Sequence, residues 1–122
     1  MDRQKPDRKT GVAHFFAAAG YSLAGARRLW RESAFRQEVL GLAGLLVLFV
    51  LVGASMGEVL GLIILGLIVL AVEALNTAVE EVVDQLSPGW STFARNAKDM
   101  GSFAVACTLV ATGLYAAWVV LL

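Results

Sequence analysis

The sequence is poor in the residues that form disulfides, rigid turns and charged surfaces. Its 122 residues include one cysteine, two prolines and one histidine, so a disulfide within the chain and a metal cluster of cysteines and histidines are both excluded. Charged residues make up 16% of the chain and hydrophobic residues 58%, and the mean hydropathy is +0.72. This composition is too apolar for a soluble domain of this length, and it predicts an integral membrane protein.

The common nucleotide-binding signatures are also missing. The chain has no GxxxxGK[ST] loop, no glycine-rich kinase loop and no HRD or DFG element. Ten basic and ten acidic residues cancel, so the net charge points to no partner, and we expect no nucleic acid among the partners. Any nucleotide site in this chain must be built without the usual phosphate-binding loops.

Three stretches can cross a membrane, for which a helix needs about 20 mostly apolar residues. Residues 39–55 carry no charge. Residues 59–72 are also uncharged, and good helix formers continue beyond them as far as the Ser-Pro-Gly sequence at 87–89. Residues 100–122 are again uncharged and give the strongest spanning signal. We predict spanning helices over residues 39–55, 57–86 and 99–122.

An interfacial helix is predicted ahead of the first span. Residues 10–33 mix apolar side chains with arginines and a tryptophan, a pattern typical of a helix that lies in the lipid headgroup plane. Residues 1–9 are expected to form a cytosolic tail. The predicted fold class is therefore all-α, with three transmembrane helices and an N-terminal amphipathic surface helix in a single domain over residues 10–122.

The distribution of lysine and arginine orients the chain. Eight of the ten precede the first span, two lie between the second and third spans, and none lies between the first and second. By the positive-inside rule, the N-terminus and the second loop are cytoplasmic. We therefore expect a multi-pass protein of the bacterial inner membrane whose polar face opens to the cytoplasm.

One face of the second spanning helix carries polar side chains near its cytoplasmic end. These residues are Glu73, Asn76, Glu80 and Asp84. They fall within about 80° of one another on a helix that turns about 100° per residue. Because charge at membrane depth is costly, this face is a candidate functional site. Two structural alternatives stay open, an ion pair of Glu73 with an arginine and a helix-end pair of Asp84 with Arg95.

The same face offers the parts that a lipid kinase requires. Phosphoryl transfer needs oxygen ligands for Mg²⁺, a cation near the phosphates and an acceptor for the hydroxyl proton. Glu80, with Glu32 from the surface helix, can supply the one or two carboxylates that Mg²⁺ typically takes. Glu73 lies two turns deeper, about 10 Å along the axis, where it can act as general base toward a lipid hydroxyl. Glu81, at the edge of the face, is interpreted as a solvated charge.

Four short segments together resemble the small prokaryotic diacylglycerol kinase family. They are GYS at 20–22, ESAFRQE at 32–38, EALNTAVEEVVD at 73–84 and AKDMGS at 97–102. The resemblance implies a homotrimer that uses Mg²⁺ and transfers the γ-phosphate of ATP to diacylglycerol, giving phosphatidic acid. The AFRQE segment favours diacylglycerol, whereas the alternative acceptor is undecaprenol, as in related kinases of the same family.

The resemblance also implies roles for individual residues. Glu73 matches the catalytic base, and Glu32 and Glu80 match the metal-binding carboxylates. The residues matched to nucleotide binding are Tyr21, Asn76, Glu80, Asp84, Lys98 and Asp99. The residues matched to the lipid substrate are Ala34, Phe35, Arg36, Gln37, Glu38, Glu73 and Ser102.

Two functions without catalysis remain open from the residues alone. A transport or channel subunit would also place carboxylates in a span, but it would line a path through both leaflets, and here only Glu58 lies on the outer side. A membrane assembly protein would use small-residue faces such as 57–61. Such a protein would not need Glu73 or Glu80.

Overall fold

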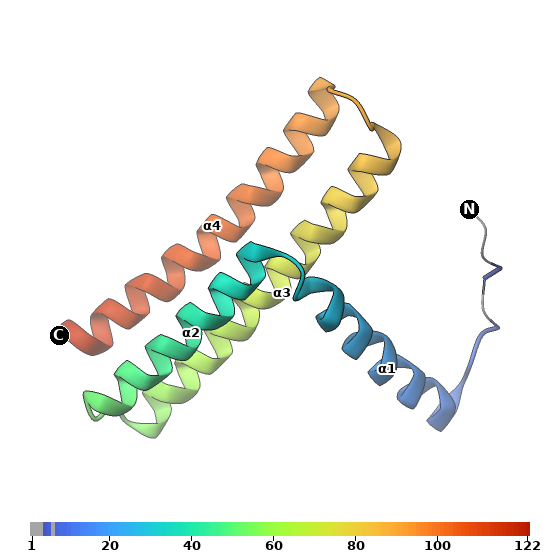
Figure 1. Cartoon of the computed structure of the whole chain (residues 1–122). Helices are drawn as coiled ribbons and strands as arrows, with labels where there is room; N and C mark the ends of the chain where they lie inside the picture. The colour runs from blue at the N-terminus through green and yellow to red at the C-terminus, as the bar shows by residue number, and fades with distance from the viewer. Residues whose placement is uncertain (1–3, 6) are drawn as a thin grey trace.

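The fold is a bundle of helices, seen in a computed structural model that describes residues 4–5 and 7–122. The elements are α1 (Gly11–Leu29), α2 (Ser33–Leu51), α3 (Met56–Leu86) and α4 (Thr92–Leu121). Helices α2, α3 and α4 are each long and apolar enough to cross a membrane. They run side by side, whereas α1 leaves the bundle at an angle (Figure 1). The prediction of an all-helical chain with three potential spanning helices is confirmed, and part of the predicted tail at 1–9 lies outside the described residues.

Two of the spanning helices begin earlier than their uncharged stretches. Helix α2 starts at Ser33 instead of residue 39, and α4 starts at Thr92 instead of residue 99. The added turns contain charged side chains, which water and headgroups at a membrane boundary can solvate while the backbone hydrogen bonds continue unchanged. The hydroxyl of Ser91 fixes the start of α4 by accepting a hydrogen bond from the amide of Ala94 at 3.1 Å.

Helix α3 spans the bundle without a break, and a capping box fixes its start. The Ser55 hydroxyl accepts a hydrogen bond from the Glu58 amide at 3.1 Å, and the Glu58 carboxylate accepts one from the Ser55 amide at 2.8 Å. Gly53, with φ of 75°, makes the turn before it. The helix ends at Leu86, directly before the Ser-Pro-Gly sequence. Glu58 is therefore a helix cap, and α3 joins an apolar half to the polar half that carries the predicted site.

The packing core lies beside the turn between α2 and α3. Phe49, Leu62 and Ala116 are its buried centre. Tyr115 of α4 donates a hydrogen bond to the carbonyl of Glu58 at 2.7 Å. This contact requires Gly61, because a Cβ at that position would lie 2.8 Å from Cζ of the Tyr115 ring.

Gly61→Ala is expected to destabilise the bundle by about 1–3 kcal/mol, the usual cost of overpacking a core. The added methyl group would displace the Tyr115 ring and break its hydrogen bond to Glu58. Thermal unfolding in detergent micelles measures the effect. Gly57→Ala is the matched control, because the nearest atom there is the Ser55 hydroxyl at 3.9 Å. Equal unfolding temperatures for the two variants would contradict this packing of α3 against α4.

Helix α1 is attached to the bundle at its C-terminal end. None of its residues is buried. The Arg36 guanidinium donates a hydrogen bond to the Trp30 carbonyl at 2.6 Å, and the Trp30 ring packs edge-on against Phe35 with centroids 6.3 Å apart. These contacts fix the corner between α1 and α2. That α1 lies in the membrane surface remains a prediction.

Candidate active site

The polar half of α3 is flanked by the start of α2 and by α4. Helix α2 begins part-way along α3, and α1 leaves the bundle at the same level, so beyond this point α3 pairs with α4 (Figure 1). Glu32 is the N-cap residue of α2, and Glu38 follows in its second turn. The topology therefore brings carboxylates from two helices to one level of the bundle.

Glu73 is the most buried carboxylate of this group, with 5% of its surface exposed. The Thr77 hydroxyl donates a hydrogen bond to the Glu73 backbone carbonyl at 3.0 Å, so that hydroxyl is satisfied within α3. The carboxyl group of Glu38 adjoins that of Glu73, and Oε2 of Glu38 is buried without a hydrogen-bond partner among the described residues. No arginine of the described residues pairs with Glu73. Among these residues, the alternative that Glu73 forms a structural ion pair with an arginine is therefore excluded.

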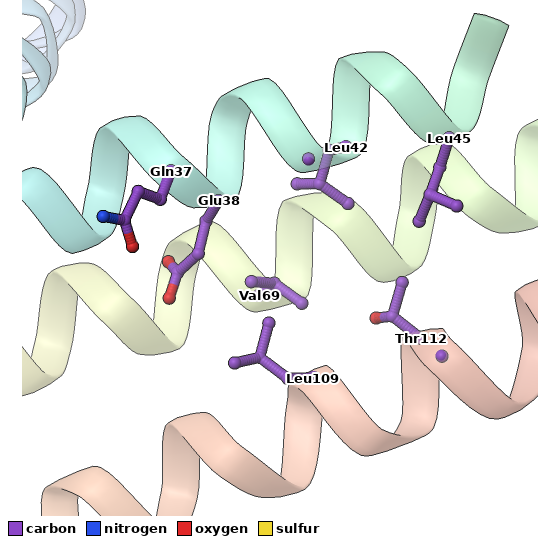
Figure 2. Close-up of a pocket in the computed structure, with 9 residues that line it drawn as sticks. Gln37, Glu38, Leu42, Leu45, Val69, Leu109 and Thr112 are labelled. Atoms are coloured by element: carbon purple, nitrogen blue, oxygen red, sulfur yellow. The ribbon is translucent and has the colours of Figure 1, made fainter.

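An apolar groove of about 390 Å³ opens beside Glu38. Figure 2 shows Leu42 and Leu45 of α2, Val69 of α3 and Leu109 of α4 around the space, with Gln37 and Glu38 at one end. The Glu38 carboxylate is directed toward α3 in this view. A groove with apolar walls and a polar end fits a ligand that has a hydrocarbon chain and a polar group.

A second hollow, of about 420 Å³, lies at the loop between α3 and α4. Lys98 pairs with Asp84 at 2.8 Å in its wall, and Asp99 and Arg95 also line it. Asp84 therefore pairs with Lys98 and not with Arg95, the partner considered from the sequence. Trp90, which is 83% exposed, gives the same hollow an indole ring beside its charges.

Arg28 connects the surface helix to α3. Its guanidinium pairs with Glu32 at 2.9 Å and with Glu81 of α3. The hydrogen bonds that the Arg28 guanidinium donates to Glu32 and, second, to Glu81 raise the pKa of Arg28 above its ordinary value, so the group stays positive at any working pH. Glu81 is exposed, with 57% of its side chain accessible, as expected for a solvated charge, and it is also an ion-pair partner of Arg28. The i,i+4 spacing of Arg28 and Glu32 could have predicted their ion pair, whereas nothing in the sequence indicates the contact between α1 and α3.

The described carboxylates of this region do not form a preformed metal site. In the part of the chain that the structure describes, no three carboxylate, histidine or cysteine side chains converge as a preformed metal site. Glu32 and Glu80 both lie close enough to Glu73 to act on it electrostatically. Mg²⁺ commonly takes one or two carboxylates and completes its shell with water and phosphate oxygens. The described residues therefore form no self-sufficient metal centre, and a Mg²⁺ ion would have to arrive with a nucleotide that supplies further ligands.

Asn76 of α3 packs closely against α4 at Gly101, next to Ser102. A Cβ at Gly101 would stand 3.1 Å from Cγ of Asn76, so the amide faces α4. Oδ1 of Asn76 is buried and has no hydrogen-bond partner among the described residues. Ser102 follows Gly101 and is exposed. Asn76 is therefore positioned between the carboxyl pair and the loop hollow.

The remaining predicted residues lie on α1 and in the first turn of α2. Ala34 is exposed and Phe35 is buried, while Arg36 is engaged with the Trp30 carbonyl. Tyr21 lies on α1 with 64% of its surface exposed, about two turns before Arg28. The structure thus brings the glutamates, Asn76 and the Asp84–Lys98 pair together along α3 and leaves Tyr21 outside that group.

The site residues lie within a stretch that is similar to known proteins. A family model described as prokaryotic diacylglycerol kinase matches residues 20–121. A protein named diacylglycerol kinase from Sinorhizobium sp is 50% identical over 115 residues, which cover 94% of this chain and 84% of that protein. Proteins of the same name are 43% identical in Pseudomonas aeruginosa over 105 residues (84% of this chain, 85% of theirs) and 35% identical in Escherichia coli strain K12 over 116 residues (93% and 92%).

Proposed function

The chain belongs to the prokaryotic diacylglycerol kinase family, and from this membership we propose that it uses ATP to phosphorylate diacylglycerol to phosphatidic acid. One observation carries the proposal. Glu38, whose carboxyl group adjoins that of the buried Glu73, lines one end of an apolar groove. Further along α3, the pair of Asp84 and Lys98 lines a polar hollow. This arrangement supports separate sites for a lipid and a nucleotide along one helix.

In the proposed reaction, the lipid hydroxyl attacks the γ-phosphorus of ATP. A bond forms between the hydroxyl oxygen and the γ-phosphorus, the bond from that phosphorus to the β,γ-bridging oxygen breaks, and ADP leaves. The hydroxyl proton passes to the carboxylate of Glu73 and then to water. Glu73 suits this role because its carboxylate is free to accept a proton. The Thr77 hydroxyl donates its hydrogen bond to the Glu73 backbone and not to the carboxylate, and no cation of the described residues pairs with that carboxylate.

Glu32 and Glu80 are the residues that would hold Mg²⁺. When bound, Mg²⁺ neutralises charge on the transferring phosphates. Lys98, which pairs with Asp84 and lies near Glu80, is the cation that would contact the triphosphate, and Asp84 and Asp99 would line the nucleotide site. Gln37 and Glu38, at the end of the apolar groove, are placed for the lipid headgroup.

We also propose that the protein is a homotrimer of the bacterial inner membrane, with its N-terminus and active site in the cytoplasm. Carboxylates on α3 need shielding from lipid, and beyond the start of α2 this helix is flanked by α4 (Figure 1). The mass of the purified protein in detergent, measured by native mass spectrometry, is expected to be that of three 13.0-kDa chains. A fully active monomer would contradict the trimer.

The choice of lipid is tested by offering diacylglycerol and undecaprenol in one mixed-micelle assay with ATP and Mg²⁺. We expect phosphatidic acid to form faster than undecaprenyl phosphate. The reverse preference would identify an undecaprenol kinase of the same family. Transfer to neither lipid would leave a membrane assembly or transport role.

A further inference from the structure

We propose that Arg28 is a positioning residue for the metal-binding carboxylate of Glu32 and that Glu81 holds Arg28 in place. This inference rests on the proposed kinase function and on the proposed role of Glu32. It concerns the three-residue cluster of Arg28, Glu32 and Glu81, which we call the α1–α3 clamp.

The geometry of the clamp joins two helices through one side chain. Nη1 of Arg28 lies 2.9 Å from Oε1 of Glu32, and Nη2 pairs with Oε1 of Glu81. The guanidinium is a rigid fork with five N–H donors, so it can hold two carboxylates at once. Because Glu81 belongs to α3 and neighbours Glu80 in sequence, the clamp holds Glu32 at the level of the second proposed metal ligand.

Little else restrains the Glu32 side chain. Glu32 is the N-cap residue of α2, yet its side chain makes no capping hydrogen bond. The contact of Arg36 with the Trp30 carbonyl fixes only the backbone of this corner, and α1 buries none of its residues. Among the described residues, Arg28 is therefore the group that sets the direction of the Glu32 carboxylate.

The charges of the clamp remain compatible with cation binding. Arg28 alone would cancel Glu32, but the second carboxylate of Glu81 leaves one net negative charge in the cluster. Arg28 engages Oε1 of Glu32, so Oε2 remains available as a metal ligand. The clamp can thus orient Glu32 without removing its attraction for Mg²⁺.

The direction in which Mg²⁺ binding changes when Arg28 loses its charge distinguishes a positioning role from a purely electrostatic one. Removing a positive charge beside a metal site should strengthen Mg²⁺ binding if charge alone mattered. Loss of orientation should weaken it, typically by 10–100-fold for a group that orients a metal ligand. We expect Arg28→Gln and Glu81→Gln each to raise the Mg²⁺ concentration for half-maximal activity by about tenfold, the low end of that range, with the KM for ATP unchanged. Arg28→Lys keeps the positive charge but loses the planar guanidinium. Its Mg²⁺ concentration for half-maximal activity should lie between those of the glutamine variants and the wild type.

A structural readout accompanies the kinetics. Hydrogen exchange of the full-length protein in micelles, without ATP or Mg²⁺, should be faster in the second half of α1 for both glutamine variants. Arg27→Gln is the matched control, because Arg27 is the exposed neighbour on α1 and pairs with no carboxylate among the described residues. It should change neither the exchange nor the Mg²⁺ requirement.

Three results would overturn the clamp. An unchanged or lowered Mg²⁺ requirement in Arg28→Gln would show that Arg28 does not orient Glu32. A raised KM for ATP with an unchanged Mg²⁺ requirement would place Arg28 on the phosphates instead. Unaltered hydrogen exchange in both glutamine variants would show that the clamp does not hold α1. The kinase proposal fails in a different way, namely if the wild-type protein phosphorylates no lipid.

Discussion

Glu73→Gln is expected to lower lipid phosphorylation by about 10²–10⁴-fold, the contribution that a general base typically makes. The amide has nearly the shape of the carboxylate but cannot accept the hydroxyl proton. Because the Thr77 hydroxyl bonds to the Glu73 backbone and not to its side chain, the substitution leaves that hydrogen bond intact. ATP binding and the thermal unfolding temperature should therefore persist, and initial rates with diacylglycerol in micelles measure the loss.

Glu38→Gln is the comparison that makes this prediction specific. Glu38 adjoins Glu73, so the structure offers two neighbouring carboxyl groups, of which one is proposed as the base. We expect a smaller loss for Glu38→Gln, with a raised KM for the lipid, because this residue lines the apolar groove. Near-native turnover in Glu73→Gln together with an inactive Glu38→Gln would assign the base to Glu38.

Glu80→Gln is expected to raise the Mg²⁺ concentration for half-maximal activity by at least about tenfold, since loss of a ligand should cost no less than loss of a group that orients one. A neutral amide is a weaker ligand for Mg²⁺ than a carboxylate, and one negative charge is lost from the site. Saturating Mg²⁺ should restore part of the activity. Rates measured across a Mg²⁺ titration give the shift.

Glu58→Gln is the matched control for Glu80→Gln. It makes the same change at the other end of α3, and glutamine can keep the capping box with Ser55. Its Mg²⁺ titration should match that of the wild type. If Glu80→Gln also gave the wild-type titration, Glu80 would have to be removed from the proposed metal site.

The spanning helices could be predicted because apolar length is a strong signal, while their ends could not. A membrane limits which side chains can be buried in lipid, so uncharged stretches mark the buried parts of α2 and α4. It does not stop a helix at the first charge, and Ser33 and Thr92 begin their helices several residues earlier. The end of α3 was predictable because the Ser-Pro-Gly sequence after Leu86 cannot continue a helix.

Helical periodicity predicted part of the candidate site and could not give the rest. The shared face of Glu73, Glu80 and Asp84 follows from one helix alone. The neighbours of these residues depend on how separate helices pack, so the approach of Glu38 to Glu73 was not available from spacing. The contact of Arg28 with Glu81 and the pairing of Lys98 with Asp84 required the structure for the same reason.

The two hollows give α3 a consistent role in the proposed reaction. The apolar groove includes Val69, and the loop hollow includes Asp84, so the two lie roughly 20 Å apart along the helix at 1.5 Å per residue. Glu73 and Glu80 lie between them. A lipid that enters from one side and an extended triphosphate from the other would meet at these two carboxylates, and this position agrees with the roles proposed for them.

Transfer of label from [γ-³²P]ATP to diacylglycerol by the purified protein tests the central claim most directly. The account predicts labelled phosphatidic acid in an amount equal to the ADP formed, dependent on Mg²⁺ and lowered by about 10²–10⁴-fold in Glu73→Gln. Absence of label from every lipid hydroxyl offered, in a preparation whose unfolding temperature shows that it is folded, would contradict it.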